Sequence, residues 1–101
     1  MKTVLRRAEP AAQRFGDLEV DPVKHQVRLR GEVVALTAAE LRIVETLARA
    51  PGRVFSRDEL VRRALAGEAN DRTVDAHVKN LRKKLDAQRI VTVIGLGYKL
   101  G

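Results

Sequence analysis

At 101 residues, the chain is long enough for one domain with its own hydrophobic core. It contains no cysteine, which excludes disulfides, thiolate metal ligands and a thiol nucleophile. No apolar run is long enough to cross a membrane and no leader resembles a signal peptide, so we expect a cytoplasmic protein without a membrane partner.

The net charge of +7 is distributed unevenly. Residues 1–50 hold nine Lys and Arg against seven Asp and Glu, whereas residues 51–101 hold eleven against six. A basic domain with clustered charge favours a polyanionic partner, nucleic acid first and an acidic membrane or protein second. The three aromatic residues are scattered along the chain, which argues against a stacking platform for single-stranded nucleic acid.

Residues 1–14 carry no core pattern, and Glu9–Ala12 reads as a linker, so we expect the folded domain over residues 15–101. Short strands follow. Phe15–Val20 is expected to be the first, Asp21-Pro22 a turn, and His25–Arg30 an alternating strand with His25 in the sheet. Gly31-Glu32 then turns the chain into Val33–Leu36. This pattern predicts a small antiparallel meander with one face covered.

Two capping boxes predict the first two helices. In Thr37-x-x-Glu40 and Ser56-x-x-Glu59, the hydroxyl and the carboxylate can satisfy the free N–H groups of a helix start. The first helix is expected to bury Leu41, Val44, Leu47 and Ala48 and to end at Pro51-Gly52. The second is expected over Arg57–Leu65, with Leu60, Val61 and Ala64 apolar.

Asp71–Asp86, with the sequence DRTVDAHVKNLRKKLD, predicts a third, amphipathic helix with a capping signal at Asn70-Asp71. Its apolar stripe is Val74, Val78, Leu81 and Leu85. The opposite face holds Arg72, Ala76, Lys79, Asn80 and Lys83.

The residue types of that opposite face suit the edge of a DNA duplex. Arg and Lys bond guanine edges or phosphates, Asn bonds adenine, and a small Ala permits close approach. The alternative is a solvated charged face on an ordinary surface helix. The helix contains five basic residues against three acids, and the acids lie at its ends and on one flank.

The last segment, Ile90–Leu100, combines β-branched residues, a Gly-Leu-Gly turn and a second short strand, which predicts a hairpin. The expected order is strands, three helices and hairpin. The expected fold is therefore α+β: a winged helix-turn-helix with an N-terminal antiparallel sheet, a three-helix core and a C-terminal β-hairpin wing.

Several linked motifs resemble the effector domain of OmpR/PhoB-type response regulators. They are Arg72–Val78, Leu81–Leu85, Thr92–Tyr98, Leu36–Leu41 and Val54–Leu60. The resemblance covers about residues 15–101 and implies a four-stranded N-terminal sheet. It also implies a transcription regulator in a two-component phosphorelay, with an aspartyl-phosphorylated receiver domain as partner and tandem binding to direct repeats of double-stranded DNA.

The residues upstream of Phe15 cannot supply a receiver domain. Lys2–Ala8 resembles the end of the last receiver helix followed by a linker, so we expect a domain from a longer protein. A natural short protein with a basic tail is the alternative.

The resemblance and the helical geometry together predict DNA contacts on the third helix and the hairpin. Asn80 and Lys79 are expected to contact bases, and Arg72 and Lys83 bases or phosphates. Arg82 can reach Asp75, so an ion pair within the helix competes with a phosphate contact. The complete predicted set is Arg72, Thr73, Ala76, His77, Lys79, Asn80, Arg82, Lys83, Thr92 and Lys99. Packing of His77 and a local backbone bond of Thr73 remain alternatives.

Two departures from the family pattern affect this prediction. Ile94 stands where the family commonly has a minor-groove arginine, and Leu65-Ala66-Gly67 lacks a tryptophan common there. The loop Ala66–Asn70 is similar in place to one that touches RNA polymerase, although a plain connector fits its composition equally well.

Enzyme chemistry has little support in the sequence. There is no glycine-rich phosphate loop, no HExxH and no Cys/His spacing for zinc, and two histidines support no triad. We therefore expect no catalytic residues, no metal and no cofactor. The predicted function is sequence-specific binding of double-stranded DNA with regulation of transcription. The alternative is an interaction module whose basic face binds an acidic protein.

Overall fold

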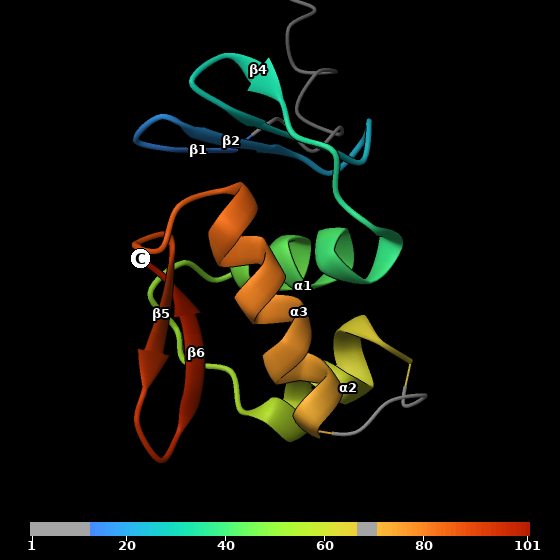
Figure 1. Cartoon of the computed structure of the whole chain (residues 1–101), viewed down its shortest axis with the longest axis vertical. Coiled ribbons are helices and arrows are strands. Elements are labelled where there is room, and N and C mark those ends of the chain that lie inside the picture. The colour runs from blue at the N-terminus through green and yellow to red at the C-terminus, as the bar shows by residue number, and fades with distance from the viewer. Residues whose placement is uncertain (1–12, 67–70) are drawn as a thin grey trace, which may run out of the picture.

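The computed structural model describes residues 13–66 and 71–101. Figure 1 shows a sheet at one end, three helices beside it and a hairpin along one flank. The elements in chain order are β1 Gln13–Phe15, β2 Leu18–Asp21, β3 Gln26–Leu29, β4 Glu32–Val33, α1 Ala38–Ala48, α2 Arg57–Ala64, α3 Asp71–Lys84, β5 Ile90–Val93 and β6 Gly97–Leu100. The α+β winged-helix prediction is confirmed.

The N-terminal sheet has four antiparallel strands in the order β1-β2-β3-β4. The prediction of one strand over Phe15–Val20 is wrong, because Gly16 and Asp17 form a two-residue turn that pairs Phe15 with Leu18. The sheet also begins two residues before Phe15, at Gln13. The strand predicted over Val33–Leu36 is shorter than expected, since β4 ends at Val33. It follows a turn in which Arg30 and Gly31 both have positive φ.

One face of this sheet closes the core. Leu18, Val20 and Val27 are at most 1% exposed, whereas their neighbours Glu19 and Arg28 pair on the other face. This alternation follows from the period of two in a strand. The inner face thereby anchors the sheet beside α1.

The prediction that His25 lies in the sheet is wrong. It lies in the turn between β2 and β3 with φ 52°, and its Nδ1 lies 3.1 Å from Oε2 of Glu45 in α1. The turn is shaped by Asp21, whose Oδ1 accepts from the backbone N–H groups of Val23 and Lys24.

The capping box of α1 is confirmed in full. Thr37 Oγ1 accepts from Glu40 N at 3.2 Å, and Glu40 Oε1 accepts from Thr37 N at 3.0 Å. The predicted stripe is buried at Val44, Leu47 and Ala48 but only half-buried at Leu41. Ile43, which was not in that stripe, is completely buried.

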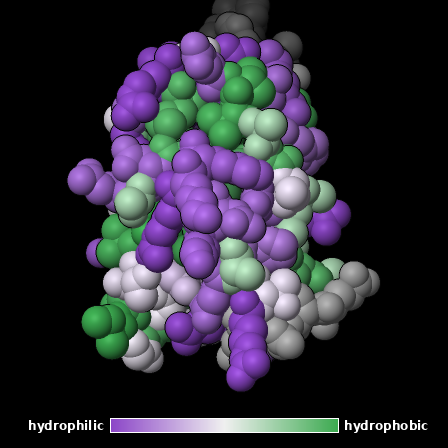
Figure 2. Space-filling view, viewed as in Figure 1, coloured by the Kyte–Doolittle hydropathy of each residue, from purple (hydrophilic) through white to green (hydrophobic). Residues whose placement is uncertain are grey.

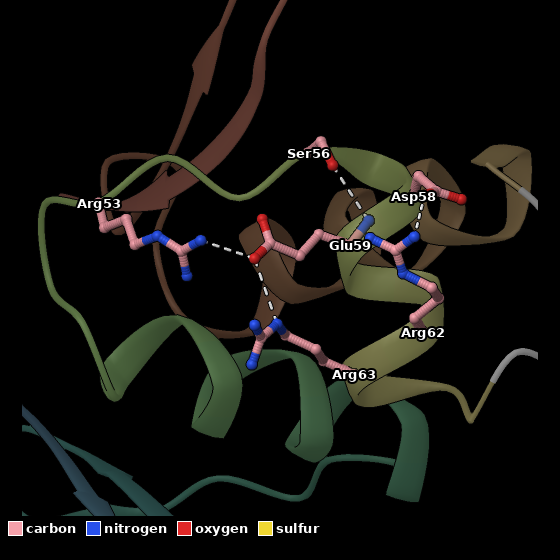
Figure 3. A network of polar contacts seen from close by, with 6 residues as sticks. All are labelled: Arg53, Ser56, Asp58, Glu59, Arg62 and Arg63. Atoms are coloured by element: carbon pink, nitrogen blue, oxygen red, sulfur yellow. Dashed lines mark hydrogen bonds and ion pairs between the residues drawn. The ribbon is translucent and has the colours of Figure 1, made fainter.

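The capping box of α2 is only half present. Ser56 Oγ accepts from Glu59 N at 3.0 Å, but the Glu59 carboxylate turns away and binds Arg53 and Arg63, at 2.7 and 3.2 Å (Figure 3). A charged donor is a stronger partner for a carboxylate than a backbone N–H. The start of α2 is therefore held by ion pairs, including Arg62 with Asp58.

The apolar stripe of α3 is confirmed, since Val74, Val78, Leu81 and Leu85 are at most 2% exposed. The helix ends at Lys84, two residues earlier than predicted. Beyond it, Asp86 begins a turn in which its Oδ1 accepts from Gln88 N. The predicted cap at Asn70-Asp71 lies outside the described residues and side chains.

The hairpin pairs β5 with β6 in register from Ile90 opposite Leu100 to Val93 opposite Gly97. It is tied to the helices through the link between α1 and α2. Phe55 N donates to Tyr98 O at 2.8 Å, and Tyr98 N donates to Phe55 O at 2.9 Å. A Cβ on Gly97 would lie 2.0 Å from Phe55 O, so only glycine permits this approach. The hairpin is thus fixed to the link between α1 and α2.

Candidate nucleic-acid interface

The face of α3 opposite its buried stripe is open to solvent. Its exposed residues are Arg72, Ala76, Lys79, Asn80 and Lys83. Helix α3 runs down the front of the molecule in Figure 1, and Figure 2 shows a hydrophilic band along the same front. The predicted face is therefore the exposed face, with three cations and an amide around one small residue.

The remaining predicted residues of α3 lie on its flanks. Thr73 and His77 are half-buried, so each combines packing with a partly accessible polar side chain. Arg82 is also half-buried, on the flank beside the hairpin.

The predicted ion pair of Arg82 with Asp75 does not form. Arg82 Nε donates to Ile90 O at 3.0 Å, and Arg82 Nη2 donates to Thr92 Oγ1. Asp75 lies two turns earlier on the helix and has other partners. Two predicted contacts, Arg82 and Thr92, are thus bonded to each other across the boundary between α3 and the wing.

Asp75 accepts two short hydrogen bonds at one oxygen. Tyr98 OH donates to Asp75 Oδ1 at 2.6 Å, and Arg57 Nε donates to the same atom at 2.7 Å. The bond from Tyr98 and that from Arg57 hold the pKa of Asp75 below its ordinary value, against partial burial, which raises it. Burial and the nearby Asp75 charge raise the pKa of Tyr98.

The sequence prediction did not include Arg57 in the interface. This residue opens α2, and its pairing with Asp75 places it next to the exposed face of α3. An exposed Arg at a helix start of a basic domain was an available signal, but its proximity to α3 depends on the tertiary structure.

The wing presents mixed chemistry. Thr92 is exposed and Lys99 is half-buried on the paired strands. The turn between the strands is apolar, with Ile94 92% exposed and Leu96 64% exposed. In Figure 2 a hydrophobic projection marks the hairpin at the lower left. The tip therefore offers no charge to a partner, and the cations lie nearer α3.

Among residues 13–66 and 71–101, no group of three or more His, Cys, Asp or Glu side chains could hold a metal ion. None of the helices described there is long and apolar enough to cross a membrane.

Comparisons with known proteins all point to bacterial transcriptional regulators. A family profile described as "Transcriptional regulatory protein, C terminal" matches residues 31–100. The chain is similar to the transcriptional regulatory protein CseB of Streptomyces coelicolor, with 47% identity over 88 residues, covering 85% of this chain and 38% of CseB. The chain spans less than half the length of CseB and of other curated relatives to which it is similar.

Solved structures of response regulators have a similar fold. The response regulator DrrB of Thermotoga maritima, an OmpR/PhoB homologue, is similar with a TM-score of 0.82 and 30% identity over 98% of this chain and 48% of DrrB. The RstA DNA-binding domain of Klebsiella pneumoniae, in complex with the RstA box, is similar with a TM-score of 0.78 and 37% identity over 89% of this chain and 96% of that domain.

Proposed function

We propose that this chain, which belongs to the OmpR/PhoB-type family of transcriptional-regulator C-terminal DNA-binding domains, reads a double-stranded DNA sequence with α3 in the major groove. Members of the family are DNA-binding domains of transcription factors and not enzymes. The function assigned to the chain is therefore that of an output domain of a two-component response regulator.

The observation that carries the proposal is the exposed face of α3. A helix fits the major groove of B-DNA, and the side chains that it directs outward must be able to bond base edges and phosphates. Here the outward residues include Lys79, Asn80 and Lys83, whereas the branched apolar residues of the same helix, Val74, Val78 and Leu81, are buried. The helix is thus rigidly held by its other side, which orders the contacts before binding.

We assign roles by chemistry. Asn80 and Lys79 contact base edges, Arg72 and Lys83 contact bases or phosphates, and Ala76 allows close approach. Thr73, His77 and Lys99 lie at the margins, where phosphate contact suits their partial exposure. Arg82 and Thr92 bond to each other in the free protein and are not counted among these contacts.

The family resemblance suggests further partners for this domain besides a single DNA site. One such helix covers only a few base pairs, so two copies on direct repeats give the specificity that a promoter needs. Because the relatives are more than twice as long, we propose a receiver domain in the full protein. We also propose RNA polymerase as a further partner, which only the family resemblance of the loop Ala66–Asn70 supports; residues 67–70 of that loop lie outside the described part of the chain. The cytoplasm, where bacterial DNA lies, is the proposed location.

The experiment is selection of bound duplexes from a random pool. A recurring direct repeat supports the proposal and supplies the target site. Salt-sensitive binding without sequence preference contradicts base reading by α3. No binding at low salt, together with binding to an acidic protein, replaces DNA reading with an interaction module.

A further inference from the structure

Four side chains join three elements beside the exposed face of α3. Asp75 and Arg82 come from α3, Arg57 from the start of α2, and Tyr98 from β6. We call these four residues the wing lock. It is separate from the exposed face itself, and none of its members was assigned a partner in the wing from the sequence.

Asp75 is the acidic member of the lock on an otherwise basic surface. Its Oδ1 accepts from Tyr98 OH at 2.6 Å and from Arg57 Nε at 2.7 Å, so one carboxylate oxygen ties α3 to both β6 and α2. A carboxylate beside a DNA-binding face repels phosphates. The bonds that Asp75 accepts from Tyr98 and Arg57, rather than contact with DNA, explain why a carboxylate lies there.

Arg82 forms the second tie to the hairpin. It donates to the backbone oxygen of Ile90 and to the hydroxyl of Thr92, which both belong to β5. Its Cζ also lies 5.7 Å from the centre of the Tyr98 ring, and Arg57 Cζ lies 5.8 Å from the same centre. Both distances allow cation–π attraction.

We propose that Asp75 and Arg82 are positioning residues: they fix the wing and the start of α2 against α3, so that all three meet one DNA site together. The inference rests on the proposed function. If the wing and the helices moved separately, ordering them on the DNA would cost conformational entropy and weaken binding. An arrangement that is already fixed in the free protein avoids that cost. The lock thus strengthens binding through the geometry of other residues.

Substitution of Asp75 tests the proposal by the sign of the effect. Asp75→Asn removes a negative charge, so electrostatics alone predicts tighter binding to the selected duplex. Positioning predicts about tenfold weaker binding, because the charge-assisted bonds to Tyr98 and Arg57 are lost. Asp58→Asn is the matched control, since it makes the same charge change at an exposed pair on α2. Tyr98→Phe, which retains the ring, is expected to weaken binding like Asp75→Asn.

Substitution of Arg82 separates positioning from phosphate contact. Arg82→Lys retains the positive charge but cannot donate from two fixed nitrogens to Ile90 and Thr92. Positioning predicts that Arg82→Lys binds as weakly as Arg82→Gln, and that adding Lys99→Ala to either variant causes little further loss. A phosphate contact predicts that Arg82→Lys binds like the wild type and that the losses add.

Hydrogen exchange of the free protein completes the test. Amides of β5 and β6 should exchange faster in Asp75→Asn and Arg82→Lys, relative to amides of α1, and should be unchanged in Lys83→Gln. Tighter binding by Asp75→Asn, wild-type binding by Arg82→Lys, or unchanged hairpin exchange overturns the inference. Failure of the wild type to bind any duplex would instead refute the proposed function, and the exchange result would still decide whether the lock holds the wing.

Discussion

Lys84, the last residue of α3, lies with its Nζ 2.7 Å from Oε1 of Glu40 in α1. Glu40 is only 2% exposed, and the same carboxylate oxygen accepts from Thr37 N. The pair therefore joins the end of α3 to the capping box at the start of α1. The contact thus fixes the C-terminal end of α3 to the N-terminal end of α1.

We predict that Glu40→Gln lowers the free energy of unfolding by about 2 kcal/mol, because it leaves the Lys84 ammonium without its anionic partner beside a buried amide. The Lys84 side chain is 37% exposed, which keeps the loss below that of a fully buried pair. Urea denaturation measures the change. Glu45→Gln is the control, with a loss below about 0.5 kcal/mol, since its partner His25 is 69% exposed.

The same pair predicts a dependence of stability on pH. Burial raises the pKa of Glu40, but the hydrogen bond and charge of Lys84, with the bonds to Thr37, outweigh it and leave the pKa below its ordinary value. A lowered folded-state pKa stabilises the protein above the unfolded-state pKa, and the stabilisation is lost as pH falls through the folded value. The difference in stability between wild type and Glu40→Gln should therefore shrink as the pH falls through the ordinary pKa of 4.5 and on through the lowered folded-state pKa. A constant difference in the urea midpoint would contradict the assignment.

Gly97→Ala is predicted to destabilise the fold by about 3 kcal/mol. The new Cβ would lie 2.0 Å from Phe55 O, so the bridge between Phe55 and Tyr98 would have to open. Gly95→Ala, where no atom lies within 4 Å of the Cβ position, should lose only about 1 kcal/mol, from its positive φ. Thermal unfolding of both variants tests this, and equal losses would show that the close approach does not matter.

Asn80→Ala and Lys83→Ala should weaken DNA binding in two different ways. Asn80→Ala is expected to lose about 1–3 kcal/mol of discrimination at one base pair of the selected site. Lys83→Ala should weaken binding to all duplexes alike and reduce the salt slope by about 1. A panel of single-base variants of the duplex distinguishes the two, and a uniform loss for Asn80→Ala would remove it from the base contacts.

Ile94→Arg should leave stability within about 0.5 kcal/mol of the wild type, because the side chain is 92% exposed. If the wing tip lies beside the DNA, the added charge should tighten binding and steepen the salt slope by about 1. An unchanged slope would place the tip away from the phosphates.

The helices and most of their inward faces were predictable because each depends on residues close in sequence, although Ile43 was missed in α1. The Thr37 capping box and the stripe from Val74 to Leu85 are local patterns, and both are confirmed. The turn at Gly16-Asp17 was missed because the apolar residues on either side of it read as one strand. Phe15 and Leu18 were assigned to that strand instead of to two paired ones.

The wing lock and the Glu40 pair were not predictable for a different reason. Asp75 and Tyr98 are 23 residues apart, and Glu40 and Lys84 are 44 apart, so only the packed fold brings them together. Arg82 shows the effect on site prediction. Helix geometry placed it within reach of Asp75, but the hairpin supplied closer partners in Ile90 and Thr92.

The central claim is that the exposed face of α3 reads a duplex sequence. The most direct measurement is the affinity for the selected duplex and for a scrambled duplex of the same composition, each followed against salt concentration. The claim predicts that both affinities fall steeply with salt while the selected duplex stays about a thousandfold tighter. Equal affinities for the two duplexes at every salt concentration would contradict it.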